Sequence, residues 1–188
     1  MENKIHVDTS WTLFLDRDGV INKRLVDDYV KHWGEFEFLE KVPETIAYCA
    51  KLFGTIVVVT NQQGIGKGLM TEEDLTDIHN NMKSQIESAG GRIDKVYFCP
   101  KLKTEQPNCR KPLPYMGYAA QKDFPKIDFK KSIMVGDSDS DMEFGSALGM
   151  TNIFITPESN KSDANLTGFK TTKLCDLTSI LQDKGSSK

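Results

Sequence analysis

The sequence predicts an α/β fold in which a doubly wound, Rossmann-like parallel sheet is covered by helices on both faces. Several short apolar runs lack the alternation of half-exposed strands and are typical of strands buried on both faces. Stretches with helical periodicity lie between these runs, and strands that alternate with helices imply right-handed crossovers. The expected strands cover 11–15, 55–60, 95–99, 132–136 and 152–155.

The first expected helix begins at about 42, after the first strand. Val42, Ile46 and Ala50 recur at helical spacing, Pro43 suits a first turn, and Gly54 suits the position that follows the helix. This segment therefore predicts a helix with one buried face.

The second expected helix covers about 71–89. Thr71 and Asp74 have the spacing of a capping box, in which Asp replaces the more usual Glu. An apolar stripe follows at helical spacing, and two glycines at 90 and 91 end it. Three further helices are expected at about 115–123, 140–148 and 176–181.

Composition limits the class of protein. The chain has 188 residues, of which 38% are hydrophobic and 27% charged, and this predicts a single domain over 1–183 with a disordered tail at 184–188. A net charge of −3 argues against nucleic acid and anionic membranes as partners. No apolar run approaches the ~20 residues that cross a bilayer, and no signal pattern opens the chain, so we expect a cytoplasmic monomer. The four cysteines are too few and too scattered for a disulfide scaffold, which predicts free thiols.

Polar side chains collect where four of the predicted strands end. Ligands of doubly wound sheets bind beyond the carboxyl ends of the strands, so these residues are expected to lie close together. In chain order they are Asp16 and Asp18, Thr60 and Asn61, Arg110 and Lys111, and Asp137.

Their chemistry indicates a metal-assisted reaction at phosphorus. Asp16 and Asp18 are two residues apart, so an extended backbone points both carboxylates to one side. Together with Asp137 they concentrate negative charge, which is costly unless a cation compensates it. Oxygen ligands at this density suit Mg²⁺, which commonly engages a substrate phosphate. One carboxylate could attack phosphorus while a second carries the proton.

These carboxylates also have two simpler interpretations. An isolated Asp-x-Asp-Gly is commonly only a turn motif. The alternation of Asp137, Asp139 and Asp141 resembles the start of a calcium loop. However, position six would be Met142 rather than Gly and position twelve Leu148 rather than Glu, which argues against calcium.

Four segments in order resemble the motifs of the haloacid dehalogenase (HAD) superfamily. They are Phe-Leu-Asp-Arg-Asp-Gly-Val-Ile-Asn at 14–22, Val-Val-Thr-Asn-Gln at 58–62, Cys-Arg-Lys-Pro at 109–112, and Val-Gly-Asp through Asp-Met at 135–142. The first three also resemble a subgroup that holds D-glycero-D-manno-heptose 1,7-bisphosphate 7-phosphatase and the histidinol-phosphate phosphatase domain.

The resemblance implies roles for the carboxylates. Asp16 would be the nucleophile and form an aspartyl-phosphate. Asp18 would protonate the leaving alkoxide and then activate water. The Asp16 carboxylate, the Asp18 backbone carbonyl and Asp137 would hold Mg²⁺. Asp141 would either order metal-bound water or cap its helix.

The resemblance also implies how a substrate is bound. Thr60, Asn61 and Lys111 would bind the transferring phosphoryl group, and Arg110 would position the rest of the substrate. Too few residues follow Asp18 before the first helix for a folded cap domain. The alternation of Phe36 and Phe38 instead predicts a small hairpin flap over about 20–41, and hence a capless, open site.

This sequence departs from the subgroup at the positions of a zinc-binding loop. Members of the subgroup often carry a Cys-x-His…Cys-x-Cys zinc loop. Here Cys99 and Cys109 remain, while Lys101 and Pro107 stand at the other ligand positions. Two thiolates cannot complete a tetrahedral site, so we predict no structural zinc and expect Pro107 and its neighbouring prolines to shape the loop.

The sequence thus predicts an Mg²⁺-dependent phosphatase that acts on a small-molecule phosphate ester, with a heptose bisphosphate as the first choice. Histidinol phosphate is the alternative. A DNA 3′-phosphatase would need a basic groove, for which 24 Lys and Arg against 27 Asp and Glu give little sign. A non-catalytic phospho-ligand binder is disfavoured because every expected catalytic group is present.

Overall fold

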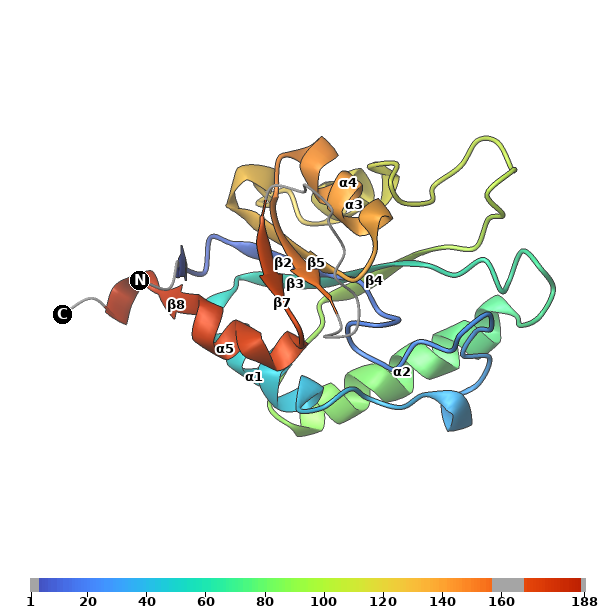
Figure 1. The fold of residues 1–188 in the computed structure, drawn as a ribbon, viewed down its shortest axis with the longest axis horizontal. Helices are drawn as coiled ribbons and strands as arrows, with labels where there is room; N and C mark the ends of the chain where they lie inside the picture. The colour runs from blue at the N-terminus through green and yellow to red at the C-terminus, as the bar shows by residue number, and fades with distance from the viewer. Residues whose placement is uncertain (1–3, 157–167, 187–188) are drawn as a thin grey trace.

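The main feature of the computed structural model, which describes residues 4–156 and 168–186, is a six-stranded parallel sheet (Figure 1). Its strand order is β4-β3-β2-β5-β6-β7. The predicted α/β fold class is therefore confirmed. The strands are β2 (Thr12–Leu15), β3 (Thr55–Asn61), β4 (Lys95–Cys99), β5 (Ser132–Gly136), β6 (Thr151–Ile155) and β7 (Phe169–Thr171).

Three short strands were not predicted. β7 lies at the edge of the main sheet, while β1 (Ile5–Val7) and β8 (Leu181–Asp183) form a separate parallel pair. Each has three residues and at least one residue that is not buried, so none gives the continuous apolar signal of the central strands.

Helices cover both faces of the sheet, as Figure 1 shows. On one face lie α1 (Val42–Leu52), α2 (Glu72–Ser88) and the short α5 (Leu177–Ile180). On the other lie α3 (Tyr115–Asp123) and α4 (Asp139–Leu148). Alternate residues of one strand serve the two cores: Leu13 and Leu15 of β2 pack towards α1, and Phe14 packs towards α3 and α4.

The start of α2 follows the predicted capping box. The Thr71 hydroxyl accepts a hydrogen bond from the Asp74 backbone N–H at 3.1 Å, and the Asp74 carboxylate accepts one from the Thr71 N–H at 2.8 Å. Both bonds satisfy backbone groups that a helix terminus leaves without a partner.

The order of the strands locates the site. β2 pairs in parallel with β3 on one side and with β5 on the other, so the order in which strands are added to the sheet reverses at β2. A crevice forms at such a switch point beyond the carboxyl ends of the strands. Asp16 follows the last residue of β2 and therefore enters this crevice.

The segment predicted as a flap, about 20–41, connects β2 to α1. Its two ends run antiparallel: an isolated bridge pairs Asn22 with Phe38, and Lys23 N–H donates to Glu37 O at 2.9 Å. Between them lies a 3-10 helix at Trp33–Glu35, whose Trp33 stacks on Phe36 with ring centroids 4.8 Å apart. The segment is thus a compact, hydrogen-bonded loop rather than a hairpin of two regular strands.

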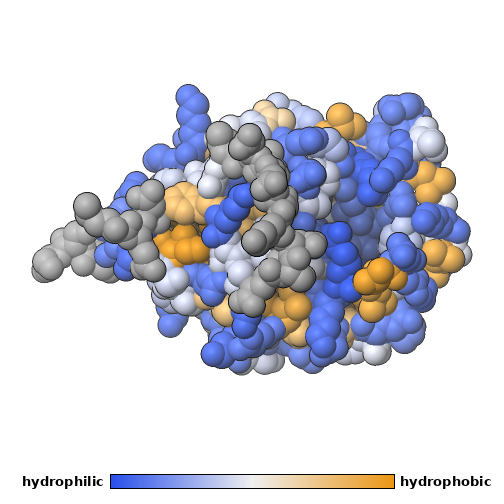
Figure 2. All heavy atoms as spheres, in the orientation of Figure 1, coloured by the Kyte–Doolittle hydropathy of each residue, from blue (hydrophilic) through white to orange (hydrophobic). Residues whose placement is uncertain are grey.

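The segment predicted as a disordered tail is partly regular. Lys184–Ser186 form a 3-10 helix within the segment predicted as a tail, and the last two residues of that segment lie outside the described part. In the described part of the chain, no helix is long and apolar enough to span a membrane. Most of the face in Figure 2 is hydrophilic, interrupted by smaller hydrophobic areas.

Candidate active site

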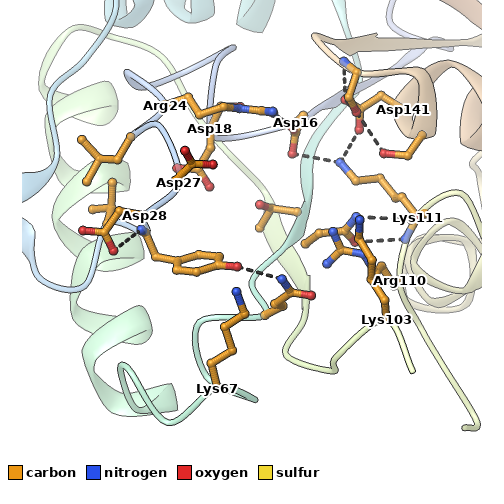
Figure 3. A pocket seen from close by; sticks show the side chains of 18 residues that line it. Asp16, Asp18, Arg24, Asp27, Asp28, Lys67, Lys103, Arg110, Lys111 and Asp141 are labelled. Carbon is orange, nitrogen blue, oxygen red and sulfur yellow. Dashed lines mark hydrogen bonds and ion pairs between the residues drawn. The ribbon is translucent and has the colours of Figure 1, made fainter. Parts of the chain in front are cut away.

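A cavity of about 510 Å³ lies at the carboxyl ends of the central strands. It brings together six of the seven residues that the sequence singled out (Figure 3). They are Asp16, Asp18, Thr60, Asn61, Arg110 and Lys111. The seventh, Asp137, lies directly beside Asp16.

Lys111 is the buried cation of the site, with 2% of its surface exposed. Its Nζ donates to Asp16 Oδ1 at 2.8 Å and to the Val59 carbonyl at 2.6 Å, and it lies 2.6 Å from Asp141 Oδ1. Figure 3 shows its side chain reaching between the two carboxylates. Burial alone would lower the pKa of Lys111, but Asp141 and Asp16 outweigh it and raise the pKa. Lys111 therefore stays charged.

Asp141 also caps a helix. Its Oδ2 accepts hydrogen bonds from the Ser138 N–H at 3.1 Å and the Ser138 hydroxyl at 2.6 Å, which caps the start of α4. Of the two roles left open by the sequence, the structure thus shows the cap, together with the ion pair to Lys111.

Asp16 and Asp137 lie in a region of excess negative charge. One ligand oxygen from each of Asp16, Asp137 and Asp141 can be chosen so that all three lie within 4.8 Å of one another. Burial and the neighbouring Asp141 raise the pKa of Asp16 to about 6, against the opposing effect of Lys111. Burial and Asp16 raise the pKa of Asp137 to about 7. Such shifts mark carboxylates that a further cation would stabilise in the ionised form.

Gly19 makes the approach of Asp137 possible. Its backbone has φ +94°, and a Cβ at this position would lie 1.9 Å from Asp137 Oδ2. Any side chain at Gly19 would therefore strain the backbone and collide with the carboxylate.

The oxygens predicted to hold Mg²⁺ surround one point, and the guanidinium of Arg24 occupies it. Arg24 Nη2 lies 3.0 Å from the Asp18 backbone carbonyl, 2.6 Å from Asp137 Oδ1 and 3.9 Å from Asp16 Oδ2. A carbonyl and two carboxylates are the oxygen donors that Mg²⁺ favours. A positive group among these three oxygens shows that the donor set fits a cation.

Asp18 receives four hydrogen bonds. Arg17 Nη2 donates to both of its carboxylate oxygens at 2.9 Å, Asn22 Nδ2 donates at 2.9 Å and Gln62 Nε2 at 2.8 Å. Burial tends to raise the pKa of Asp18, but these donors, led by Arg17, hold it below its ordinary value. The arrangement favours the ionised carboxylate, the form that accepts a proton.

Thr60 and Asn61 end β3 beside Lys111. The Thr60 hydroxyl accepts a bond from Gln62 Nε2 at 2.9 Å and still has one proton to donate. The Asn61 side chain bonds the Lys111 backbone twice, accepting from its N–H at 2.9 Å and donating to its carbonyl at 3.3 Å. Asn61 therefore fixes the loop that carries Lys111.

Besides Lys111 and Arg24, three cations line the cavity: Lys67, Lys103 and Arg110 (Figure 3). Lys67 Nζ lies 5.1 Å from the centre of the Tyr29 ring. Across residues 4–156 and 168–186, no carboxylate lies within ion-pair distance of any of the three. This group, called the outer cations below, has positive charge available for an anionic ligand.

The loop before Arg110 is closed by a disulfide between Cys99 and Cys109. The prediction that all four cysteines are free thiols is therefore wrong for this pair, although Cys49 and Cys175 are free. Sequence reasoning could not find the pairing because the two cysteines are ten residues apart with no other signal. The expectation was that Pro107 and its neighbouring prolines shape this loop, and the disulfide is an additional constraint at its two ends. Zinc binds thiolates, a form that the disulfide removes, and the absence of structural zinc stays a prediction.

Reduction of this disulfide is expected to weaken substrate binding more than turnover, because the loop carries Lys103 and leads directly into Arg110. Opening a loop of this size costs about 2–4 kcal/mol of stability. The measurement is thermal unfolding and steady-state kinetics with and without dithiothreitol. A C99S/C109S variant is the control, and a reductant effect of equal size in that variant would contradict the assignment.

Comparison with known proteins places this site in a family. Residues 108–178 match a family model described as HAD-hydrolase-like. A D-glycero-α-D-manno-heptose-1,7-bisphosphate 7-phosphatase from Mycobacterium bovis is 43% identical over 133 residues, covering 71% of this chain and 70% of the relative. One of the same name from Burkholderia mallei is 44% identical over 147 residues, covering 73% and 75%. This chain belongs to the heptose-bisphosphate phosphatase family of the HAD superfamily.

A solved structure of that family agrees with the membership. The D,D-heptose 1,7-bisphosphate phosphatase from B. bronchiseptica, complexed with magnesium and phosphate, matches with a TM-score of 0.81 at 26% identity. The match covers 90% of this chain and 96% of that one. Both the predicted superfamily and the predicted subgroup of the HAD phosphatases are thereby confirmed.

Several residues of the site were not predicted as such. Arg17, Gln62 and His79 surround Asp18 or support its partners. Arg24 was expected only as a flap residue that contacts the substrate, and its contact with the cation-binding oxygens was not predicted. Arg17 and Gln62 lie inside quoted motifs, so their nearness to Asp18 was a usable signal. His79 gave none, because it lies in the middle of a helix far along the chain.

Proposed function

We propose that this protein hydrolyses the 7-phosphate of a D-glycero-D-manno-heptose 1,7-bisphosphate with Asp16 as the nucleophile. The observation that carries the proposal is the position of Asp16, whose carboxylate lies beside both a buried lysine and a set of cation-binding oxygens. A phosphoryl group at this point would meet positive charge on two sides, which phosphoryl transfer requires. A cytoplasmic location and a monomeric state stay predictions.

In the first step the Asp16 carboxylate attacks phosphorus and the bond to the sugar oxygen breaks, which leaves an aspartyl-phosphate. Asp18, which takes up a proton from water in the second step of one turnover, delivers that proton to the departing alkoxide of the next. In the second step Asp18 accepts a proton from water as the water oxygen attacks phosphorus. The bond between phosphorus and the Asp16 oxygen breaks, inorganic phosphate leaves, and the Asp16 carboxylate is regenerated. Lys111, Thr60 and the second N–H of Asn61 would bind the phosphoryl oxygens.

Magnesium fits the oxygens described above. The Asp16 carboxylate, the Asp18 backbone carbonyl and Asp137 would hold the ion, and when bound it would neutralise phosphoryl charge. Its binding would require Arg24 to leave these oxygens, and Arg24 could then contact the substrate.

Asp137→Asn is expected to remove the stabilisation of the fold by Mg²⁺. At a free ion concentration of about 100 times the Kd, binding should stabilise the native protein by about 2.7 kcal/mol. Thermal unfolding with and without Mg²⁺ measures the effect. The matched control is Asp139→Asn, two residues further on at the start of α4, since Asp139 is exposed and should leave the shift unchanged. An equal shift in both variants would exclude Asp137 as a ligand.

The outer cations favour a bisphosphate over histidinol phosphate. A heptose bisphosphate carries a second phosphate away from the reacting one, whereas the amine of histidinol would bring a positive charge to this end of the cavity. Lys67, Lys103 and Arg110 would attract the former and repel the latter.

The decisive experiment compares kcat/KM for phosphate release from the heptose bisphosphate and from histidinol phosphate. The two relatives named above carry the name of the α anomer, which is therefore the first to assay. We expect a clear preference for the bisphosphate, and Lys103→Ala should lower kcat/KM for it about tenfold while sparing a monophosphate ester.

Lys101→Ala is the matched control, because Lys101 belongs to the same loop but does not line the cavity. A preference of the unmodified protein for histidinol phosphate would reverse the proposed substrate. An equal loss in both lysine variants would show that the loop itself, rather than the charge of Lys103, matters.

A further inference from the structure

His79 is a buried histidine that the reaction described above does not use. It lies in the middle of α2, is 7% exposed and does not line the cavity. Its Nε2 lies 3.2 Å from Nη1 of Arg17, which belongs to the loop after β2. A contact between these two distant segments joins a helix on one face of the sheet to the catalytic loop.

The chemistry of arginine fixes the form of this histidine. A guanidinium N–H can only donate, so Nε2 of His79 must accept and cannot carry a proton. His79 is therefore neutral and protonated at Nδ1. Burial and the charge of Arg17 lower the pKa of His79 to about 3, in agreement with the neutral form.

The planar guanidinium of Arg17 is held through both of its terminal nitrogens. Its side chain is fully buried, Nη1 meets His79, and Nη2 donates to both carboxylate oxygens of Asp18. Its Nε has no hydrogen-bond partner among the described residues. The His79 contact is thus an anchor on the side of the guanidinium away from Asp18.

We propose that His79 is a positioning residue that orients Asp18 through Arg17. The inference rests on the proposed role of Asp18 in proton transfer. Without an acceptor at Nη1, the buried guanidinium can rotate towards other acceptors, and both bonds from Nη2 to Asp18 change with it. The consequence falls on the proton transfers and not on the binding of substrate.

His79→Leu is the first test, because leucine fills the space but accepts no hydrogen bond. We expect kcat to fall about tenfold or more with KM nearly unchanged, since supporting residues of a site commonly contribute at that level. His79→Gln offers an amide oxygen in place of Nε2 and should recover most of the lost rate. A Leu variant with normal kcat, or a folded Gln variant as slow as the Leu variant, would overturn the inference.

A double-mutant cycle separates this inference from the proposed function. If His79 acts only through Asp18, adding H79L to D18N should cause no further loss. An additional loss would overturn the role of His79. A D18N variant with normal activity would instead overturn the proposed role of Asp18 itself.

Two measurements guard against a purely structural effect. Met82→Ala removes a buried apolar side chain from the same helix and leaves His79 itself unchanged, so it should lower Tm while leaving kcat nearly unchanged. Nitrogen NMR of the unmodified protein at neutral pH should find the His79 proton on Nδ1. A proton on Nε2 would overturn the inference even if H79L does not fold. For a folded H79L, an equal loss of kcat in M82A would overturn it as well.

Discussion

Replacing Asp16 by Asn is expected to abolish turnover while the protein stays folded. The amide oxygen can still accept the hydrogen bond from Lys111, and loss of the negative charge relieves repulsion from Asp141 and Asp137. An amide, however, is a poor nucleophile towards phosphorus. We expect kcat to fall on the order of 10⁴-fold or more, with no loss of Tm.

The measurement is phosphate release from the heptose bisphosphate, together with thermal unfolding. Asp139→Asn serves again as the control, because it removes one carboxylate of similar type from an exposed position. Activity of D16N within tenfold of the unmodified protein would show that another group attacks phosphorus.

Replacing Lys111 by Met is expected to cause the largest loss of stability. Methionine fills a similar volume, but it leaves Asp16 and Asp141 buried without the cation that lies 2.8 and 2.6 Å from them. Removing one partner of a buried ion pair typically costs about 3–5 kcal/mol. Activity should fall as well, because the phosphoryl group loses its buried positive partner.

Chemical denaturation measures this loss, and Lys95→Met is the control. Lys95 pairs with Asp123 at 2.7 Å on the surface, where an ion pair contributes little. Adding Asp141→Asn to K111M should restore part of the stability, since it removes one of the unpaired charges. Equal losses in K111M and K95M would show that the buried network does not stabilise the fold.

The central part of the fold was predictable because its strands are buried on both faces. β4 and β5 have the predicted ends, and β2, β3 and β6 differ from the predictions by one residue. The edge strand β7 has only three residues, none of them buried, so it could not be distinguished from a loop. The other edge strand, β4, is also partly exposed but has five residues and was predicted. The pairing of β1 with β8 depends on the two chain ends meeting in space, which local patterns do not encode.

The candidate site was predictable to the extent that it follows from strand order. Asp16, Asp18 and Asp137 gather because parallel strands place their carboxyl ends at one edge of a sheet. The contacts of Arg24 and His79 could not be predicted, since both depend on how the flap and α2 pack against that edge. The role of Asn61 in fixing Lys111 is of the same kind, because it depends on the path of a loop fifty residues away.

Gly19 has a consequence for any survey of random variants of this protein. No atom of Gly19 needs to touch a substrate, yet every replacement, including alanine, would push a methyl group or more into Asp137 Oδ2. Position 19 should therefore tolerate substitution as poorly as the catalytic aspartates do. A selection for activity would single it out as essential even though glycine brings no reactive group of its own.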